Sequence, residues 1–252
     1  SCGFQILAHG LTVPAVGIEG LRLEQINQKV AQYWSVSVTE ETTSTQIDLA
    51  NNFKAGNVLV AEYQSAGRGR LDRKFEVPPR KGLTFSFCLD AQAELGWIPL
   101  ITGLAVSNAI NKYLNQNLTN VKWPNDLLID GKKLAGILSE KNSFGVVVGV
   151  GINIFQTREE LPIDNAVSLS MFGEIDRTEL LIEILNELGN TLSNIAIHKN
   201  EYRSKCATLG KTVRATLPNG EVIEDMAIAI SEEGALLLKN REISVGDILH
   251  LR

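Results

Sequence analysis

Residues 57–75, NVLVAEYQSAGRGRLDRKF, join a β-rich run to a loop in which glycines alternate with arginines. The composition of residues 57–63 predicts a strand. In the loop that follows, glycines let the backbone approach a ligand closely, and guanidinium groups form forked hydrogen bonds to phosphate oxygens. Phe75 adds a ring on which a flat base can stack. The stretch therefore predicts a strand that ends in a ligand-binding loop.

The charge of this loop is opposite in sign to that of the whole chain. Residues 67–81 contain six basic residues (68, 70, 73, 74, 80 and 81) and two acidic ones (72 and 76), a local balance of +4. The full chain of 252 residues has a net charge of −5, so general solubility does not account for the cluster. The loop predicts binding of a polyanion, and ATP, RNA and a phosphoprotein all stay open at this point.

The segments around the loop alternate between strand and helix patterns. Apolar residues recur with helical spacing in 97–116, and Asp176 with Glu179 predicts the start of a long amphipathic helix that continues through Ile195. Asp130-Gly131 between two apolar runs predicts a tight hairpin. These patterns indicate a mixed α/β domain over residues 38–207. Its other expected elements are a helix capped by Ser44 that ends near Lys54, and strands at 83–89, 127–129, 133–139 and 146–154.

The texture changes again after residue 210. Residues 211–252 hold short β-like runs separated by turn residues, a spacing that favours a small β-barrel. We therefore divide the chain into an N-terminal segment (1–37), a mixed α/β domain (38–207) and a C-terminal barrel (208–252). An RNA-binding or adaptor role for the barrel is the less favoured interpretation, because residues 211–252 contain no aromatic side chain on which a base could stack.

Bulk composition excludes several classes of protein. The content of 44% hydrophobic and 21% charged residues is that of an ordinary globular protein. The three cysteines, at positions 2, 88 and 206, are odd in number and far apart, which argues against a disulfide framework or a zinc site. No stretch approaches the roughly 18 apolar residues that span a bilayer, and the first thirty residues show no secretory signal. We expect a cytoplasmic protein.

Two further segments carry polar groups that suit a nucleotide. Residues 121–126, VKWPND, put a lysine, an aromatic ring and a carboxylate at the mouth of the predicted hairpin, where Pro124 interrupts a regular ladder. A carboxylate beside a phosphate-binding loop is a candidate Mg²⁺ contact, and an Asx turn that merely starts a strand is the alternative. Residues 132–140, KKLAGILSE, place two lysines on opposite faces of a strand, without indicating which face is inward.

Four of these motifs together, in this order and at these intervals, resemble those of biotin protein ligases. They are GRGR (67–70), KWPND (122–126), KLAGIL (133–138) and GVGIN (149–153). Thr42-Thr-Ser-Thr45 also resembles the segment whose hydroxyls contact the ureido ring of biotin in that family. The resemblance runs from residue 42 to the C-terminus. It implies an α/β mixed-sheet catalytic domain of the class II aminoacyl-tRNA synthetase/biotin ligase fold, followed by an SH3-like barrel.

The resemblance also implies a reaction and its residues. The chain would activate biotin with ATP and Mg²⁺ to biotinyl-5′-AMP and transfer the biotinyl group to a lysine of a biotin carboxyl carrier protein or domain of a carboxylase. Lys133, Arg70 and Asp126 would be catalytic, with Asp126 also the Mg²⁺ contact. The biotin pocket would comprise Ser44, Thr45, Gln64, Gly67, Arg68, Lys133 and Gly136, and the ATP site would comprise Arg70, Arg73, Phe75, Lys122, Asn125 and Asn153.

Three positions depart from the pattern of the family. Gln46, Asp72 and Phe75 stand where its members usually have Asn, Gly and Trp. Phenylalanine keeps a face for stacking and lacks the indole N–H, while Asp72 lowers the positive charge of the loop and restricts its backbone.

Other activities stay open beside this one. A lipoate or octanoate ligase would share the architecture, although its arginine and glycine loop differs from GRGR. A biotin-dependent transcriptional repressor would need a winged helix-turn-helix, for which residues 1–36 are too short, although 4–7 and 10–13 resemble the tail of a wing. We expect no DNA or membrane partner for this chain, and the resemblance is compatible with a homodimer formed through an edge of the catalytic sheet.

Overall fold

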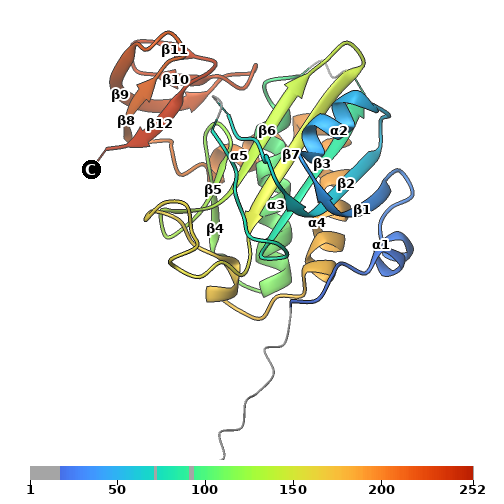
Figure 1. The fold of residues 1–252 in the computed structure, drawn as a ribbon. Coiled ribbons are helices and arrows are strands. Elements are labelled where there is room, and N and C mark those ends of the chain that lie inside the picture. The colour runs from blue at the N-terminus through green and yellow to red at the C-terminus, as the bar shows by residue number, and fades with distance from the viewer. Residues whose placement is uncertain (1–17, 71–72, 91–93, 252) are drawn as a thin grey trace, which may run out of the picture.

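The fold consists of a seven-stranded mixed sheet with helices on both faces and a smaller antiparallel sheet of five strands (Figure 1). The computed structural model describes residues 18–70, 73–90 and 94–251. In the larger sheet the order is β1-β2-β3-β7-β6-β5-β4, with β1 and β2 parallel and the other neighbours antiparallel. Its strands are β1 (Ser35–Thr42), β2 (Asn57–Gln64), β3 (Gly82–Asp90), β4 (Thr119–Lys122), β5 (Asp126–Ile129), β6 (Lys132–Lys141) and β7 (Gly145–Asn153). The predicted mixed α/β class is confirmed.

Helices cover the two faces of this sheet unequally. The short helix α2 (Thr45–Asn51) packs on β2, β3 and β7, whereas α3 (Ile98–Leu114) and α4 (Arg177–Leu192) pack together on the opposite face (Figure 1). The main core lies between the sheet and these two long helices, where strands β3, β6 and β7 bury their apolar side chains. The face that carries α2 is therefore the one with room for a ligand. In the described part of the chain, no helix combines the length and the apolar character that crossing a membrane requires.

The helix predicted from Asp176 starts as expected and ends earlier. Asp176 caps α4, because its carboxylate accepts from the backbone N–H groups of Thr178 and Glu179 at 2.8 and 3.2 Å. The prediction of one helix through Ile195 is wrong: α4 ends at Leu192, and a separate helix α5 (Ile195–Lys205) follows. Ser193 and Asn194 lie between them, and such side chains compete for backbone hydrogen bonds within a helix. An unbroken apolar period concealed this interruption.

The predicted hairpin at Asp130-Gly131 is confirmed. The two residues join β5 to β6 and have φ angles of 49° and 75°. Positive φ at both central residues is the geometry of a type I′ turn, which matches the right-handed twist of a β-hairpin. The turn fixes the register of β6, and β6 carries the KLAGIL motif.

Residues 18–34 pack on the larger sheet and its helices. Helix α1 (Leu23–Lys29) lies against β1 and α4, and its Ile26 is fully buried. Trp34 donates its indole N–H to the carbonyl of Leu185 in α4 at 2.8 Å. The described part of the expected N-terminal segment is thus tied to the α/β domain. Residues 1–17, including those that resemble a wing, lie outside the described residues.

The C-terminal strands form an antiparallel sheet in the order β11-β10-β9-β8-β12. Its first and last members, β11 and β12, are not hydrogen-bonded to each other within the described residues, so this sheet is not the fully closed barrel that the strand spacing predicts. Two-residue β11 offers little backbone for such closure. The strands are β8 (Thr212–Thr216), β9 (Val222–Ile230), β10 (Leu236–Leu238), β11 (Glu242–Ile243) and β12 (Asp247–His250), and the remaining element of the chain is a 3₁₀ turn, η1 (Leu169–Met171).

A single turn of the smaller sheet docks it onto the larger one. Trp97 and Trp123 donate their indole N–H groups to the carbonyls of Glu232 and Gly234 at 2.7 and 3.0 Å. A Cβ atom on Gly96 would lie only 2.1 Å from the carbonyl oxygen of Glu233, so the two backbones touch. Buried aromatic rings with satisfied N–H groups make this a specific contact. It fixes the position of β12 relative to the larger sheet.

We expect the free energy of unfolding to fall between pH 6.5 and about 4, in part through His250. Burial lowers the pKa of His250 to about 4, assisted by the charges of Lys122 and Lys211. The folded state keeps this side chain neutral while the unfolded chain binds a proton near pH 6.5, so its contribution is present above pH 6.5 and lost as the pH falls toward 4. Urea unfolding at several pH values should show a smaller decline in His250→Gln than in the wild type. Equal declines would exclude His250 as a cause.

Candidate active site

A cavity of about 350 Å³ lies on the sheet face that carries α2. Its walls come from β6, β7, the start of α2, the loop after β2 and one residue of β12. All four sequence motifs contribute residues to it. Twelve of the fourteen residues predicted for the site line this cavity: Ser44, Thr45, Gln64, Arg68, Arg70, Arg73, Phe75, Asn125, Asp126, Lys133, Gly136 and Asn153.

Three glycines give the cavity a floor without side chains. Gly149 and Gly151 are two residues apart on β7 and therefore face the same side, and Gly136 of β6 pairs with Gly151. A Cβ atom on Gly149 would lie 2.8 Å from Oε1 of Gln46, and one on Gly151 would lie 2.6 Å from the ring of Phe75. Side chains of α2 and of the loop thus lie where other residues would put their own. The floor has room for a flat ligand.

The end of the cavity near Gly149 is lined by polar side chains. Thr45 donates from its backbone N and Oγ1 to Oε1 of Gln64 at 2.8 and 3.1 Å, and its Oγ1 lies 2.8 Å from Oγ of Ser86. Ser86 in turn donates to Oε1 of Gln46 at 3.2 Å. Such a buried network fixes its members in one arrangement, because each polar atom is costly to leave unpaired.

Ser44 adds a hydroxyl that is not satisfied within the protein. It occupies the N-cap position of α2, as predicted, yet its side chain makes no capping hydrogen bond. Its Oγ is buried and has no partner among the described residues. A buried hydroxyl without a partner carries a free-energy cost that a ligand with a hydrogen-bonding group would remove. This atom marks the polar end as a place for a ligand with such groups.

Farther along the floor, Lys133 and Asp126 form an ion pair. Nζ of Lys133 lies 2.6 Å from Oδ1 of Asp126. The angles are not those of a hydrogen bond, because Oδ1 has no hydrogen-bond partner within the described residues. A Cβ atom on Gly136 would lie 3.4 Å from the same Nζ, so the ammonium group lies over the glycine floor. A register shift in the β5–β6 ladder beside Leu128 re-aims this part of β6 toward the cavity.

The backbone of Lys133 is held from its other side by residues 165–167. Its N–H donates to the carbonyl of Asn165, and its carbonyl accepts from the N–H of Val167, both at 2.9 Å. This local ladder fixes the direction of the Lys133 side chain, which strand alternation alone leaves undecided. Lys132, on the opposite face, does not line the cavity.

Arginines of the loop connect the cavity to the smaller sheet. Arg70 donates to Oδ1 of Asn125 at 3.0 Å and to the carbonyl of Gly246 at 3.3 Å. Burial lowers the pKa of Arg70 from its usual value, although it still stays charged at neutral pH. Arg73 forms a forked ion pair with Asp247, and that hydrogen-bonded contact lowers the pKa of the carboxyl group. Two positive charges thus face the cavity at its border with β12.

Some predicted residues serve the loop or the frame of the cavity in this structure. Gly67 does not line the cavity: its carbonyl accepts from the N–H of Phe75 at 2.9 Å, and a Cβ atom there would lie 2.2 Å from the Phe75 carbonyl oxygen. Arg68 lines the cavity while its guanidinium forms a forked contact with Glu140 at 3.2 and 3.1 Å. Asn153 is buried and donates to the carbonyl of Val167 at 3.2 Å.

Lys122 lies behind Asp126 and does not line the cavity. Its Nζ is 4.0 Å from Oδ2 of Asp126, and burial lowers its pKa against the opposing effect of that carboxylate. Asp126 therefore has an ammonium group on each side, from Lys122 and from Lys133. Its charge is already balanced without a ligand.

This arrangement does not fit a preformed Mg²⁺ site. The described residues contain no cluster of three or more His, Cys, Asp or Glu side chains that could hold a metal ion by themselves. The carboxylate predicted as the Mg²⁺ contact, Asp126, is flanked by two lysines that would repel a cation. Mg²⁺ commonly binds through one or two carboxylates together with substrate phosphates. A contact at Asp126 stays a prediction from the sequence.

Comparison with known proteins bears on what occupies this cavity. Residues 35–153 match the biotin/lipoate A/B protein ligase family, and residues 208–251 match the biotin protein ligase C-terminal domain. The biotin–[acetyl-CoA-carboxylase] ligase of Mycobacterium tuberculosis is 35% identical over 241 residues, which cover 86% of this chain and 89% of that protein. The chain belongs to the biotin protein ligase family.

Other biotin protein ligases agree in sequence and in fold. The bifunctional ligase/repressor BirA of Bacillus subtilis is 32% identical over 242 residues, which cover 88% of this chain and 73% of that protein. The biotin protein ligase of Aquifex aeolicus in complex with biotin and ATP superposes with a TM-score of 0.77 at 32% identity, covering 86% of this chain and 99% of that one. The resemblance seen in the sequence is confirmed at the level of family and fold.

Against this biotin protein ligase background, several cavity residues were not predicted from the sequence. Gln46 and Ser86 of the polar network, Gly149 and Gly151 of the floor, and Asp247 of β12 all line the cavity. The glycines of GVGIN were a usable signal, because two glycines on one face of a strand indicate close approach of another group. Nothing in the sequence joins Asp247 to Arg73. The ring of Phe75 packs on Gly151, so phenylalanine fits this position, and Asp72 lies outside the described residues.

Proposed function

We propose that this chain activates biotin with ATP to biotinyl-5′-AMP and transfers the biotinyl group to a lysine of a biotin carboxyl carrier domain. One observation carries the proposal: a cavity with a glycine floor that is polar at one end and bears Lys133 and Arg70 at the other. Biotin has the matching distribution of groups, with a ureido ring at one end and a carboxylate at the other. Family membership supports the same reaction.

The polar end suits the ureido ring. The ring presents two N–H donors and a carbonyl acceptor, and the hydroxyls of Ser44 and Thr45 and the amide of Gln64 can pair with them. From Gly149 to Gly151 the floor advances by about 7 Å, at roughly 3.3 Å per strand residue, which carries the ligand from this network toward Lys133. A lipoyl or octanoyl chain has no hydrogen-bonding groups for this end and would leave those hydroxyls unpaired. The network therefore favours biotin over the alternative acids.

In the first step, the carboxylate of biotin attacks the α-phosphorus of ATP, and pyrophosphate leaves. Both reactants are anionic, so positive charge must lie between them. The ammonium of Lys133 is placed over the floor where the carboxylate arrives, and Arg70 and Arg73 face the phosphates from the loop. Fixed charges of this kind stabilise the transition state because they are already oriented. Mg²⁺ brought by ATP would lessen the charge of the phosphates further.

In the second step, the amine of the acceptor lysine attacks the carbonyl of biotinyl-5′-AMP, an amide bond forms, and AMP leaves. A lysine is nucleophilic only when deprotonated. Asp126 lies beside Lys133 at the same point of the floor and is the carboxylate suited to accept or orient that proton. Phe75, which packs on Gly151, can cover the adenine of the adenylate and limit access of water.

The direct test uses the purified chain with biotin, ATP, Mg²⁺ and an isolated carrier domain. We expect one biotinyl mass to be added to a single acceptor lysine, and biotinyl-5′-AMP to accumulate when the acceptor is left out. Mass spectrometry of both products measures each step separately. A parallel reaction with lipoate serves as the control for acid specificity. Formation of lipoyl-AMP without biotinyl-AMP would overturn the proposal.

Other roles expected from the sequence are kept within limits. Some relatives are bifunctional ligase/repressors, but we propose no operator binding for this chain, and a biotin-dependent gel shift with specific DNA would contradict that. A homodimer and a cytoplasmic location stay predictions. The acceptor is proposed by chemistry alone, as a carrier domain that presents an exposed lysine.

A further inference from the structure

A buried ion pair lies at the base of the ligand-binding loop. Glu62 of β2 and Arg177, the first residue of α4, are 5% and 4% exposed, and Nη1 of Arg177 lies 2.6 Å from Oε2 of Glu62. Neither residue lines the candidate active site. Burial of two charges is costly unless the pair also makes good hydrogen bonds, so its further contacts show what the pair holds in place.

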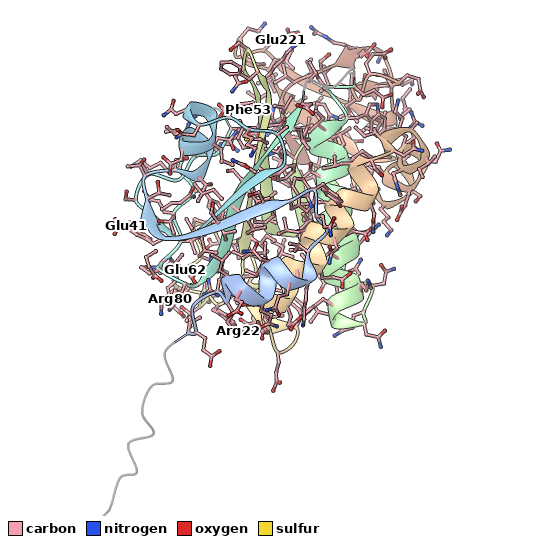
Figure 2. All side chains as sticks on the ribbon, turned by 90° about the vertical axis from the view of Figure 1, so that its right-hand side faces the viewer. Arg22, Glu41, Phe53, Glu62, Arg80 and Glu221 are labelled. Carbon is pink, nitrogen blue, oxygen red and sulfur yellow. The ribbon has the colours of Figure 1, made fainter. Side chains whose placement is uncertain are left out.

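Those contacts reach both ends of the loop. β2 ends at Gln64, two residues after Glu62, and β3 begins at Gly82, whose carbonyl accepts from Nη1 of Arg177 at 3.2 Å. The carbonyl of Glu62 also accepts from the backbone N–H of Arg80 at 2.9 Å. Figure 2 shows Glu62 and Arg80 at the same corner of the molecule. One guanidinium–carboxylate pair therefore fixes the two strand ends between which the GRGR loop is suspended.

The same pair binds the segment that precedes α1. Oε1 of Glu62 accepts from the N–H of Leu21, and Nη2 of Arg177 donates to the carbonyl of Glu19, both at 2.6 Å. Arg22, labelled near Glu62 in Figure 2, binds Asp176 instead and has no contact with the loop in the described residues. Loosening the N-terminal segment at Arg22 is thus separable from loosening the loop at Arg177.

The clamp adjoins the residues that the ligands would touch. Glu62 shares a small cavity of about 10 Å³ with Gln64, Phe75 and Gly82. Gln64 belongs to the polar network, and Phe75 packs over the floor. A shift of the strand ends would therefore move both side chains. Replacement of a buried ion pair by apolar residues is often neutral for stability, so stability alone gives no reason to keep two charges here.

We infer that the Arg177–Glu62 pair is a positioning device: it keeps the strand ends at β2 and β3 fixed, and so holds Gln64 and Phe75 ready for biotin and the nucleotide. The inference rests on the proposed function for the identity of those ligands. Arg177 and Glu62 are positioning residues, because neither touches the cavity where the reaction takes place.

The test compares Arg177→Lys with the wild-type chain. Lysine keeps the charge but lacks the planar fork that reaches Glu62, Gly82 and Glu19 together. We expect KM for biotin and for ATP to rise about tenfold with kcat within about twofold, because a loop that is competent in only about a tenth of the molecules lowers apparent affinity by that fraction. Trypsin cleavage after Arg68 and Lys74 should accelerate by a similar factor.

Cleavage after Lys211, an exposed lysine of the smaller sheet, is the internal reference for global unfolding. An equal acceleration at Lys211 and in the loop would overturn the inference, because the whole fold would then have loosened. Arg22→Gln is the matched control, since it removes an ion pair of the N-terminal segment and leaves the loop contacts in place. It should keep wild-type KM values and loop cleavage.

A double variant, Glu62→Leu with Arg177→Met, covers the case in which a single substitution does not fold. It removes both charges, so no unpaired charge is left buried. We expect a folded chain with the raised KM values and rapid loop cleavage of Arg177→Lys. Wild-type behaviour of the double variant would overturn the inference. The cleavage measurements need no turnover, so they still test the clamp if the wild-type chain forms no biotinyl-5′-AMP and the proposed function fails.

Discussion

Lys133→Ala is expected to reduce the rate of adenylate formation by about 10²–10³-fold, the usual effect of removing one fixed group that stabilises developing charge. The ammonium of Lys133 lies over the glycine floor, 2.6 Å from Asp126, at the point where the carboxylate of biotin would meet the α-phosphate. Without it the two anionic reactants approach each other with less compensation. The effect should fall mainly on kcat, measured as biotinyl-5′-AMP formed in a single turnover.

Lys132→Ala is the matched control, since it removes the neighbouring lysine of β6, which does not line the cavity. It should retain wild-type turnover. Thermal unfolding of both variants establishes that each chain is folded. Comparable activity of Lys133→Ala and Lys132→Ala would remove Lys133 from the catalytic residues.

Gly151→Val is expected to weaken the binding of biotin and of ATP by about 100-fold while the fold persists. A Cβ atom at this position lies 2.6 Å from the ring of Phe75, so the ring must leave its place over the floor, and the two methyl groups then occupy the space of the ligand. Overpacking of a tight site costs about 1–3 kcal/mol, and about 2.7 kcal/mol corresponds to a hundredfold loss of affinity. Valine suits a strand, so β7 should still form. Isothermal titration calorimetry measures both ligands.

Gly103→Ala provides the comparison for adding a side-chain atom to a buried glycine elsewhere. At Gly103, in α3, the nearest atoms to a new Cβ are 3.6 Å away, an ordinary contact. This variant should bind both ligands as the wild type does. Wild-type affinity in Gly151→Val would show that the glycine floor is not where the ligands lie.

Local chemistry explains which parts of the fold could be predicted from the sequence. The Asp130-Gly131 turn needs positive φ at two adjacent residues, a demand that few residue pairs meet, so the hairpin could be recognised directly. The start of α4 was equally clear, because an aspartate at the N-cap satisfies two backbone donors. The interruption at Ser193 and Asn194 was missed, since the apolar period continues across it into Ile195.

The site was harder to predict wherever its residues meet only through the tertiary fold. The motifs identify Lys133, Arg70 and Asp126 because each lies in a distinctive local pattern. Asp247 follows no such pattern, and it reaches Arg73 only because one turn of the smaller sheet docks on the larger one. Gln46 was noted only as a departure, although its side chain meets both Ser86 and the space above Gly149.

The docking of the smaller sheet also has a spectroscopic consequence. Two of the three tryptophans of the chain, Trp97 and Trp123, donate their N–H groups to the docking turn, while Trp34 lies with α4 in the core. Lys199 and Arg203 each lie 5.2 Å from the centre of the Trp97 ring and separate this indole optically from the others. Undocking would expose two of three emitters to water, with a red shift of intrinsic fluorescence. The chain therefore carries a built-in reporter for the unit that supplies Asp247, without any added label.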